Sequence, residues 1–430
     1  MRGLGVFAEI VGVVRERPLR FLATALLSLV ALLASASAQA RAPHPSIPPP
    51  VVPEGFGVNI HFTDPQPGEM KKIAESGARW VRMDLHWDTT EREKGVYDFS
   101  AYDRLVQALD EHGLKALFIL DYGHPLYDGG LAPRDEATRQ AFARWATEAA
   151  RRYAKKGYLW EVWNEPNQKM FWRPKPNAKD YAALALAVAR AFREAGLDEA
   201  LIGPATSRID LGFLKTCFKA GLLEHWAAIS VHPYRMWLPP ETAGVSYDRL
   251  RALLRRQGAD GDFPILSSEW GYSSVQFGLD AELQGKFLAR MWLFNLASGV
   301  PLSIWYDWKN DGSDPKNNEH NFGIVGTDLN PKPAFHAAKT LTEALAGHRF
   351  ERRLRVGDAK NYVLEFSREG KPRWAAWRSS PKPATVILPG LTGRFHSVSH
   401  DGKVVKLLTA GPKGLQLRLG DAPQYLQALP

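Results

Sequence analysis

Residues 160–167 read Trp160-Glu161-Val162-Trp163-Asn164-Glu165-Pro166-Asn167. The apolar run at residues 158–163 lacks a helical period and lies between Gly157 and Pro166, which favours a short buried strand. Parallel strands that end in polar side chains are typical of a (β/α)8 barrel, because its active site lies at the carboxyl ends of the strands. The alternative is a helix capped by Asn164 or Asn167, which leaves the two tryptophans unexplained.

Strand and helix patterns alternate on both sides of this stretch, as in an α/β barrel. The predicted strands are residues 55–62, 79–85, 115–121, 158–163, 201–204, 228–232, 264–269 and 302–306. The predicted helices are residues 68–76, 101–112, 135–155, 178–195, 247–256, 280–297 and 334–345. The sequence therefore predicts an α/β fold, with a (β/α)8 TIM barrel over residues 55–347.

The pattern changes after Gly347. Short strand-like runs separated by Gly and Pro turns occur at residues 362–366, 373–377, 385–388 and 415–419. They predict a small C-terminal β-sandwich domain over residues 348–430, which either buttresses the barrel or binds glycan. Trp374 and Trp377 are three residues apart, so they would not share a strand face, which argues against one stacking platform.

The charge of the chain is concentrated in this C-terminal part. The formal net charge is +9, and residues 349–430 hold 15 Lys and Arg against 6 Asp and Glu, a difference of +9. The basic residues either form a solvated face or attract an anionic polysaccharide or envelope surface. No nucleic-acid-binding motif accompanies them, so we do not expect a nucleic-acid partner.

The N-terminus has the features of an export signal. Three arginines precede an apolar run at residues 21–34, and small residues that suit signal cleavage follow it. Residues 1–40 are therefore predicted to be a signal peptide or an uncleaved membrane anchor, and residues 41–54 a proline-rich linker. We expect an exported protein, periplasmic or secreted, that contacts membrane only through this segment. Cys217 is the only cysteine, so an intrachain disulfide is excluded.

A second strand-end carboxylate occurs at Glu269, at the end of the strand predicted at residues 264–269. Hydrolysis of a glycosidic bond with retention needs two carboxyl groups about 5–5.5 Å apart. Glu165 and Glu269 would end the fourth and seventh strands, which face each other across the barrel mouth. The pair therefore predicts a retaining glycosidase, and either residue alone could be a solvated loop acid.

Trp163-Asn164-Glu165-Pro166-Asn167 resembles the acid/base signature of the large clan of retaining glycoside hydrolases on (β/α)8 barrels, and within it most of all family 39. The likeness extends to residues 55–59, 80–88, 268–271 and 330–333. It is greatest to endoglycosidases encoded with bacterial exopolysaccharide synthesis, of the Psl type. It implies that Glu165 is the acid/base and Glu269 the nucleophile.

The resemblance also implies roles for residues around the two glutamates. Asn164 would donate to the sugar 2-hydroxyl, and Tyr234 would orient the nucleophile. Arg82 would lie beside Glu269 and keep it ionised, and the alternative is an ion pair with Asp84. The remaining predicted substrate-binding residues are His86, Trp87, Tyr122, His232, Trp270 and Trp305.

His232 could instead be a hydrogen-bonded core histidine, and some of the tryptophans could be core residues. The acidic loop at residues 307–328 matches no calcium-binding pattern, so we expect no metal and no cofactor. The sequence thus predicts an exported retaining endo-glycosidase of a bacterial exopolysaccharide, associated with its synthesis or export machinery. The alternatives are an exo-acting β-xylosidase or iduronidase, and a catalytically inactive glycan-binding barrel.

Overall fold

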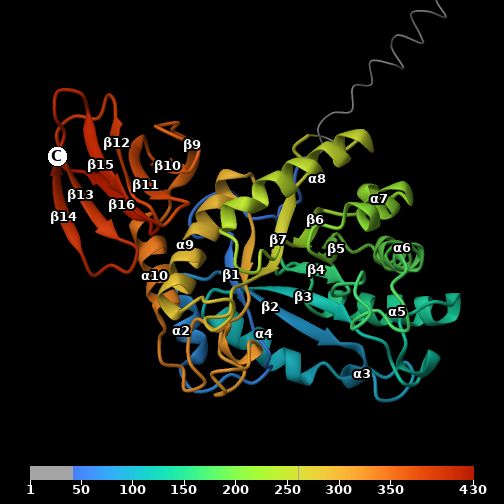
Figure 1. Cartoon of the computed structure of the whole chain (residues 1–430). Coiled ribbons are helices and arrows are strands. Elements are labelled where there is room, and N and C mark those ends of the chain that lie inside the picture. Colours follow the sequence, from blue (N-terminus) through green and yellow to red (C-terminus); the bar gives the residue numbers. More distant parts are fainter. Residues whose placement is uncertain (1–41, 260) are drawn as a thin grey trace, which may run out of the picture. The chain divides into compact units, whose positions relative to one another are not determined.

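Eight parallel strands close into a barrel in the computed structural model, which describes residues 42–259 and 261–430 (Figure 1). Each strand pairs with the next, and β1 pairs with β8 to close the ring. The strands are β1 Phe56–Asn59, β2 Trp80–His86, β3 Lys115–Asp121, β4 Leu159–Val162, β5 Ala200–Ser207, β6 Ala228–His232, β7 Ile265–Trp270 and β8 Ser303–Trp305. The predicted (β/α)8 barrel is confirmed, and the predicted export segment lies outside the described residues.

Helices surround the barrel (Figure 1). They are α2 Glu69–Glu75, α3 Trp87–Thr90, α4 Ser100–Glu111, α5 Glu136–Arg152, α6 Ala178–Glu194, α7 Leu211–Lys219, α8 Gly244–Arg256, α9 Ala281–Ala297 and α10 Pro333–Ala344. The sequence-based prediction lacks α7, although Asp210 caps it by accepting from the backbone N–H groups of Gly212 and Phe213. Within the described ranges, no helix combines the length and apolarity needed to cross a membrane.

The interior of the barrel is a separate apolar core, built from alternate strand residues. Its buried side chains are Trp80, Leu117, Ile119, Leu159, Ala200, Ile202, Ala228, Leu266, Leu302 and Ile304. Because side chains alternate along a strand, the residue two positions after an interior residue also points inward. Arg82 follows Trp80 and Glu161 follows Leu159 in this way, so the strand period carries both charged side chains towards the barrel mouth.

The proline-rich segment before β1 packs onto the protein. Val52 is fully buried, and its backbone N–H donates to the carbonyl of His348 at 3.0 Å. The backbone N–H of Gly347 donates in turn to the carbonyl of Val52 at 2.8 Å, and Val51 bridges Arg349. Residues 51 and 52 of the predicted proline-rich linker are therefore held by backbone bonds to residues 347–349.

The C-terminal domain is an antiparallel structure of two sheets. Six strands lie in the order β14-β13-β16-β11-β10-β9, and β12 pairs with β15 in a second sheet. Their bounds are β9 Arg349–Arg353, β10 Asn361–Arg368, β11 Lys371–Arg378, β12 Ala384–Leu388, β13 Arg394–Ser399, β14 Val405–Thr409, β15 Leu415–Leu419 and β16 Gln424–Ala428. Side chains from both sheets, including Trp374 and Leu417, form one buried core, as the predicted sandwich requires.

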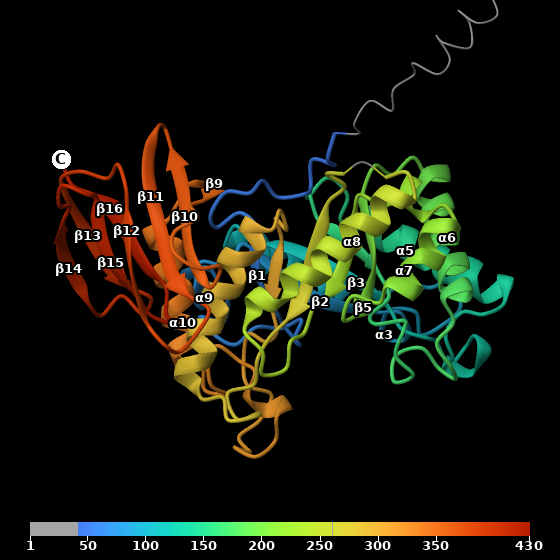
Figure 2. The ribbon, with the colours of Figure 1, turned by 45° about the horizontal axis from the view of Figure 1, so that its top comes forward.

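Trp377 joins this domain to the barrel from the opposite face of β11. Its indole N–H donates to Glu241 Oε1 at 2.6 Å, and Arg290 of α9 makes two bonds to the same carboxylate at 2.8 and 2.7 Å. Trp377 also stacks on Tyr362, with ring centroids 4.9 Å apart. Figure 2 shows the β9–β16 domain beside α9 and α10. Trp374 and Trp377 thus serve two different cores, and both are buried.

Candidate active site

Glu165 and Glu269 meet at the carboxyl ends of the barrel strands. Glu165 follows β4 and Glu269 lies in β7. A carboxylate oxygen of each lies with a ring nitrogen of His232 in a set of atoms within 4.8 Å of one another. His232 Nδ1 is 2.9 Å from Glu165 Oε1 and 3.9 Å from Glu269 Oε1. The structure therefore brings together the two glutamates singled out in the sequence, which lie 104 positions apart in the chain (269 − 165).

The chain turns sharply where β4 ends. Trp163 has φ 69° and Glu165 has φ 42°, so two residues that are not glycine adopt the left-handed region. Surrounding hydrogen bonds hold this backbone: Trp163 N–H donates to the Leu120 carbonyl at 3.0 Å, and Glu165 N–H donates to the Ala205 carbonyl at 3.1 Å. The strained turn presents the Glu165 carboxyl to the barrel mouth. Its backbone is held by these two hydrogen bonds to β3 and β5.

Arg82 is the hub of the charged groups at the mouth. Its guanidinium donates to Glu269 at 2.6 Å, to Glu161 at 2.8 Å and to Asn164 Oδ1 at 2.9 Å. The Arg82 side chain is 1% exposed and that of Glu161 is completely buried. Burial alone would lower the pKa of Arg82, but the charges of Glu161 and Glu269 raise it. The alternative pairing of Arg82 with Asp84 is wrong, because Glu161 takes that place.

Glu161 is a site residue that sequence reasoning missed. The signal was present, because a carboxylate two residues after the interior Leu159 must find a cation inside the barrel. Arg82 is the group that meets it, and one guanidinium then joins β2, β4 and β7.

Glu269 is held as a carboxylate. Burial alone would raise its pKa, but the charges of His232 and Arg82 and the hydrogen bonds from Tyr234 and Arg82 lower it below the ordinary value. Tyr234 Oη donates to Glu269 Oε1 at 2.8 Å. Each carboxylate oxygen thus accepts a bond from a different side, which fixes the orientation of the group.

Asn164 lies between the two halves of the site. Its Oδ1 accepts from Arg82, and its Nδ2 donates to Tyr122 Oη at 3.0 Å. The amide is therefore locked in one orientation, with Nδ2 towards Tyr122. Burial raises the pKa of Tyr122, and the nearby charge of Asp121 raises it further. The Tyr122 hydroxyl therefore keeps its proton.

A cleft of about 630 Å³ opens above the two glutamates. Several of its lining residues were not predicted from the sequence: Asn59, His61, Asp84, Met170, Phe171, Ser207, Arg208, Met236, Tyr306, Glu319 and Phe322. They lie at the ends of several different strands and in the loops that follow them, so no single motif marks them. The cleft also includes the predicted residues Arg82, Tyr122, Asn164, Glu165 and Tyr234 together with Glu269.

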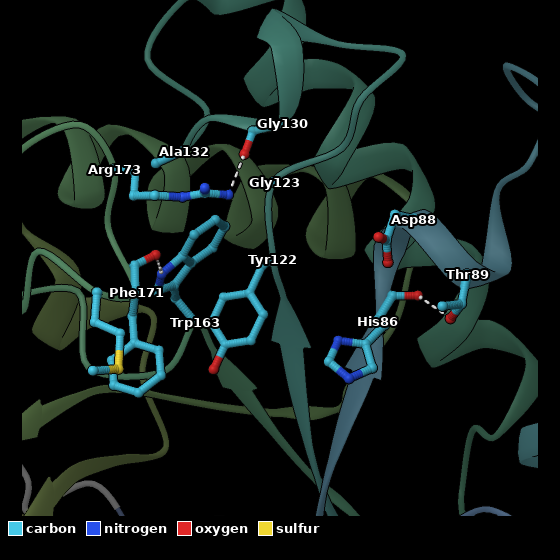
Figure 3. A pocket seen from close by; sticks show the side chains of 11 residues that line it. His86, Asp88, Thr89, Tyr122, Gly123, Gly130, Ala132, Trp163, Phe171 and Arg173 are labelled. Atoms are coloured by element: carbon cyan, nitrogen blue, oxygen red, sulfur yellow. Dashed lines mark hydrogen bonds between the residues drawn. The ribbon is translucent and has the colours of Figure 1, made fainter.

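A second cavity, of about 500 Å³, adjoins this cleft (Figure 3). Tyr122, Met170 and Phe171 line both hollows, and the rings of Tyr122 and Phe171 stack with centroids 5.9 Å apart. His86, predicted to bind substrate, lies in this second cavity, and its Nδ1 is 3.5 Å from Asp121 Oδ1. An aromatic wall thus separates the glutamate pair from a further polar hollow.

The three tryptophans that were predicted to bind substrate do not reach the cleft. Trp87, Trp270 and Trp305 are completely buried, and none of them lines either hollow. Trp87 packs between Tyr127 and Trp145 behind β2, and Trp305 donates to the Phe322 carbonyl at 3.2 Å. The expectation that these three side chains bind substrate is therefore wrong. Tyr306 lines the cleft beside them instead.

Two groups among the described residues place three metal-ligand atoms within 4.8 Å of one another. One is the Glu165, His232 and Glu269 set itself. The other is His61 with Asp307 and Asp311, in which His61 Nδ1 lies 3.1 Å from Asp311 and 3.5 Å from Asp307. Both groups consist of two acids and a histidine.

Comparison with known proteins supports the architecture. No protein-family model matches the chain. A β-xylosidase of Geobacillus stearothermophilus is 27% identical over 207 residues, which are 42% of this chain and 40% of that protein. A β-amylase of Zea mays is 42% identical over 53 residues, which are 12% of this chain and 11% of that protein. The chain therefore spans less than half the length of these curated relatives.

Solved structures match over much more of the chain. A family 39 glycoside hydrolase of Bacteroides cellulosilyticus has a TM-score of 0.75 and 25% identity, covering 89% of this chain and 82% of that one. A β-xylosidase of Caulobacter crescentus has a TM-score of 0.61 and 17% identity over 89% and 98%. A family 30 endoxylanase of Clostridium papyrosolvens has a TM-score of 0.63 and 10% identity over 90% and 98%. The chain is thus similar to glycoside hydrolases of families 39 and 30 along most of its length, and it carries paired glutamates at the mouth of their fold.

Proposed function

We propose that this protein is a retaining endo-glycoside hydrolase that cleaves a bacterial exopolysaccharide through a covalent glycosyl-enzyme. The observation that carries the proposal is that one carboxylate oxygen of Glu165 and one of Glu269 lie within 4.8 Å of each other. Retaining enzymes hold their carboxyl groups about 5–5.5 Å apart, whereas inverting enzymes leave room for a water at about 6.5–9.5 Å. The separation therefore favours double displacement.

In the first half of the reaction, Glu269 attacks the anomeric carbon and forms a glycosyl ester. The glycosidic C–O bond breaks at the same time, and Glu165 gives its proton to the departing oxygen. The nucleophile must be ionised for this step. His232, Arg82 and Tyr234 supply that condition, since the charges of the first two and the bonds from Tyr234 and Arg82 lower the pKa of Glu269.

In the second half, Glu165 takes a proton from a water molecule, whose oxygen attacks the same anomeric carbon. The ester to Glu269 breaks, and its carboxylate returns. His232, 2.9 Å from Glu165, keeps that carboxyl in place for both steps. Asn164, fixed by Arg82 and Tyr122, is placed to hydrogen-bond the 2-hydroxyl of the sugar.

Endo action is supported by the extent of the site. The catalytic cleft and the cavity behind Tyr122 and Phe171 together offer room for more than one sugar ring. The predicted export segment and the resemblance to exopolysaccharide-associated endoglycosidases support a polymer outside the cytoplasm as substrate. Association with the synthesis or export machinery belongs to the same proposal.

The second candidate is an exo-acting β-xylosidase, which is favoured by the likeness to β-xylosidases of Geobacillus stearothermophilus and Caulobacter crescentus. A catalytically inactive glycan-binding barrel is the third, and the intact glutamate pair argues against it. The size of the products separates these candidates, because endo cleavage releases oligosaccharides and exo cleavage releases single sugars.

The test compares the wild-type protein with Glu269→Gln on a panel of extracted bacterial exopolysaccharides and on aryl β-xyloside. We expect the wild type to release oligosaccharides from one polymer. The rate of release should be at least ~10³-fold lower in Glu269→Gln. Glu111→Gln, a surface change on α4, is the matched control. Equal product from the wild type and Glu269→Gln would refute Glu269 as the nucleophile, and release of xylose alone would favour the exo enzyme.

A further inference from the structure

Two large aromatic side chains stand exposed beside each other in the loops after β6 and β7. Trp237 and Phe277 are each 53% exposed, and their ring centroids are 4.8 Å apart. These loops follow the strands that carry His232 and Glu269, so both lie at the catalytic end of the barrel. Exposed apolar surface of this kind, gathered in one place at the catalytic end of a barrel, is typical of a ligand-binding site.

The backbone holds the pair in place. Met236, which precedes Trp237, has φ 58°, and Phe277 has φ 53°. Both residues therefore adopt the left-handed region. The Leu238 carbonyl accepts from the buried Tyr272 hydroxyl at 2.9 Å, which ties the Trp237 loop to the end of β7. Left-handed conformations at residues other than glycine cost energy and persist where the fold over-determines them. The exposed pair is therefore a built feature of these loops.

The pair is continuous with the catalytic cleft. Met236, the neighbour of Trp237 in the chain, lines the cleft together with Arg208 from the loop after β5. Arg208 is exposed, and its side chain forms no ion pair with a carboxylate among the described residues, so its donors are available to a ligand. This side of the cleft thus leads from Glu165 past Arg208 and Met236 to an exposed aromatic surface.

We propose that Trp237 and Phe277 form a sugar-binding subsite outside the catalytic centre, which holds another residue of the same polysaccharide chain. This inference rests on the proposed function and adds to it. Sugar rings present an apolar C–H face and polar edges, and exposed aromatic rings bind such faces. Arg208 would donate to hydroxyl or carboxylate oxygens at the edge of the sugars between this surface and Glu165. Together with the cavity behind Tyr122 and Phe171, this subsite would give the polysaccharide a binding surface on two sides of the catalytic pair.

The test uses affinity electrophoresis of the full-length Glu269→Gln protein in gels that contain xylan, mannan or an extracted exopolysaccharide. This parent holds a polymer without cleaving it. Adding Trp237→Ala is expected to weaken the binding about five- to tenfold, since one sugar–aromatic contact is lost. Trp237→Phe should recover most of the binding. Leu407→Ala, a similarly exposed residue of β14 in the C-terminal domain, should bind like the parent.

Kinetics on substrates of two lengths complete the test. Trp237→Ala in the active enzyme should lower kcat/KM on the polymer at least fivefold more than on 4-nitrophenyl β-glycosides. Polymer binding that is equally tight in Trp237→Ala would overturn the subsite. So would an enzyme that hydrolyses an aryl glycoside but binds no polymer, and that outcome leaves the catalytic assignment intact. If the protein neither binds a polymer nor cleaves an aryl glycoside, the proposed function fails, and the subsite fails with it.

Discussion

Arg82, which is buried, forms an ion pair with Glu269 across the barrel mouth, with Arg82 Nη1 2.6 Å from Glu269 Oε2. The two residues lie on β2 and β7, and the same guanidinium binds Glu161 of β4. One side chain therefore helps to set the charge of Glu269, the proposed nucleophile, and links three strands. Stability and catalysis are coupled at this point, and substitutions here should change both.

Arg82→Lys should lower kcat/KM at least ~100-fold, because one ammonium cannot satisfy Glu161, Asn164 and Glu269 in the planar geometry of the guanidinium. It should also lower the free energy of unfolding by about 3 kcal/mol, since a buried carboxylate loses its partner. Urea unfolding and steady-state kinetics measure the two effects. Arg104→Lys, at the exposed ion pair with Asp64, is the matched control and should change neither quantity. An Arg82→Lys protein of wild-type stability would contradict the hub role of Arg82.

Tyr234→Phe should shift the acid limb of the kcat/KM profile to higher pH. The hydrogen bond from Tyr234 lowers the pKa of Glu269, so its removal raises that pKa. Activity needs ionised Glu269 and falls as the pH drops through the pKa of that group. Because this pKa is higher in Tyr234→Phe, the variant loses activity at a higher pH than the wild type. The pH dependence of aryl glycoside hydrolysis measures the shift. Tyr247→Phe deletes a buried hydroxyl that donates to Asn295, and it should leave the limb in place. An acid limb at the same pH in Tyr234→Phe and Tyr247→Phe would show that Tyr234 does not control the pKa of Glu269.

The fold was predictable because strand period and strand ends are local properties of the sequence. The turn at Trp163–Pro166 and the carboxylate at Glu269 each follow a short apolar run, and the parallel barrel brings such ends together. β5 extends three residues beyond its predicted end at Pro204, to Ser207. The run at residues 201–204 gave no sign of this, since the added residues Ala205, Thr206 and Ser207 are small or polar.

The fate of the tryptophans was not predictable in the same way. Trp87, Trp270 and Trp305 stand at strand ends, where a sugar-stacking role and a core role give the same sequence pattern. Which role holds depends on packing from distant segments, such as Trp145 against Trp87 and the Phe322 carbonyl on Trp305. Trp237 has the opposite fate, because its loop turns it out to solvent.

Asp307→Asn should flatten the pH dependence of stability between pH 4 and 7. Burial raises the pKa of Asp307 from 3.8 to about 7, and the charge of His61 opposes this shift only in part. The folded state therefore binds the Asp307 proton more tightly than the unfolded state. The contribution is complete below about pH 4 and is lost as the pH rises through about 7. Melting temperatures measured from pH 4 to 9 test this, with Asp248→Asn, an exposed carboxyl on α8, as control. Wild-type pH dependence in Asp307→Asn would contradict the assignment.

Trp377→Phe should lower the free energy of unfolding of the whole chain by about 2 kcal/mol. The substitution removes the N–H that donates to the buried Glu241 carboxylate, and bonds to charged acceptors contribute about 1.5–3 kcal/mol. Because Glu241 also binds Arg290 of α9, the loss is felt on the barrel side of the contact. Differential scanning calorimetry should show a single transition that moves to lower temperature. Trp374→Phe, whose indole N–H donates to Glu365 inside the C-terminal domain, is the matched control for a change of the same chemistry away from the barrel. A barrel transition that stays at the wild-type temperature while a separate C-terminal transition moves would show that the two parts unfold independently, and the buttressing role of the domain would then be rejected.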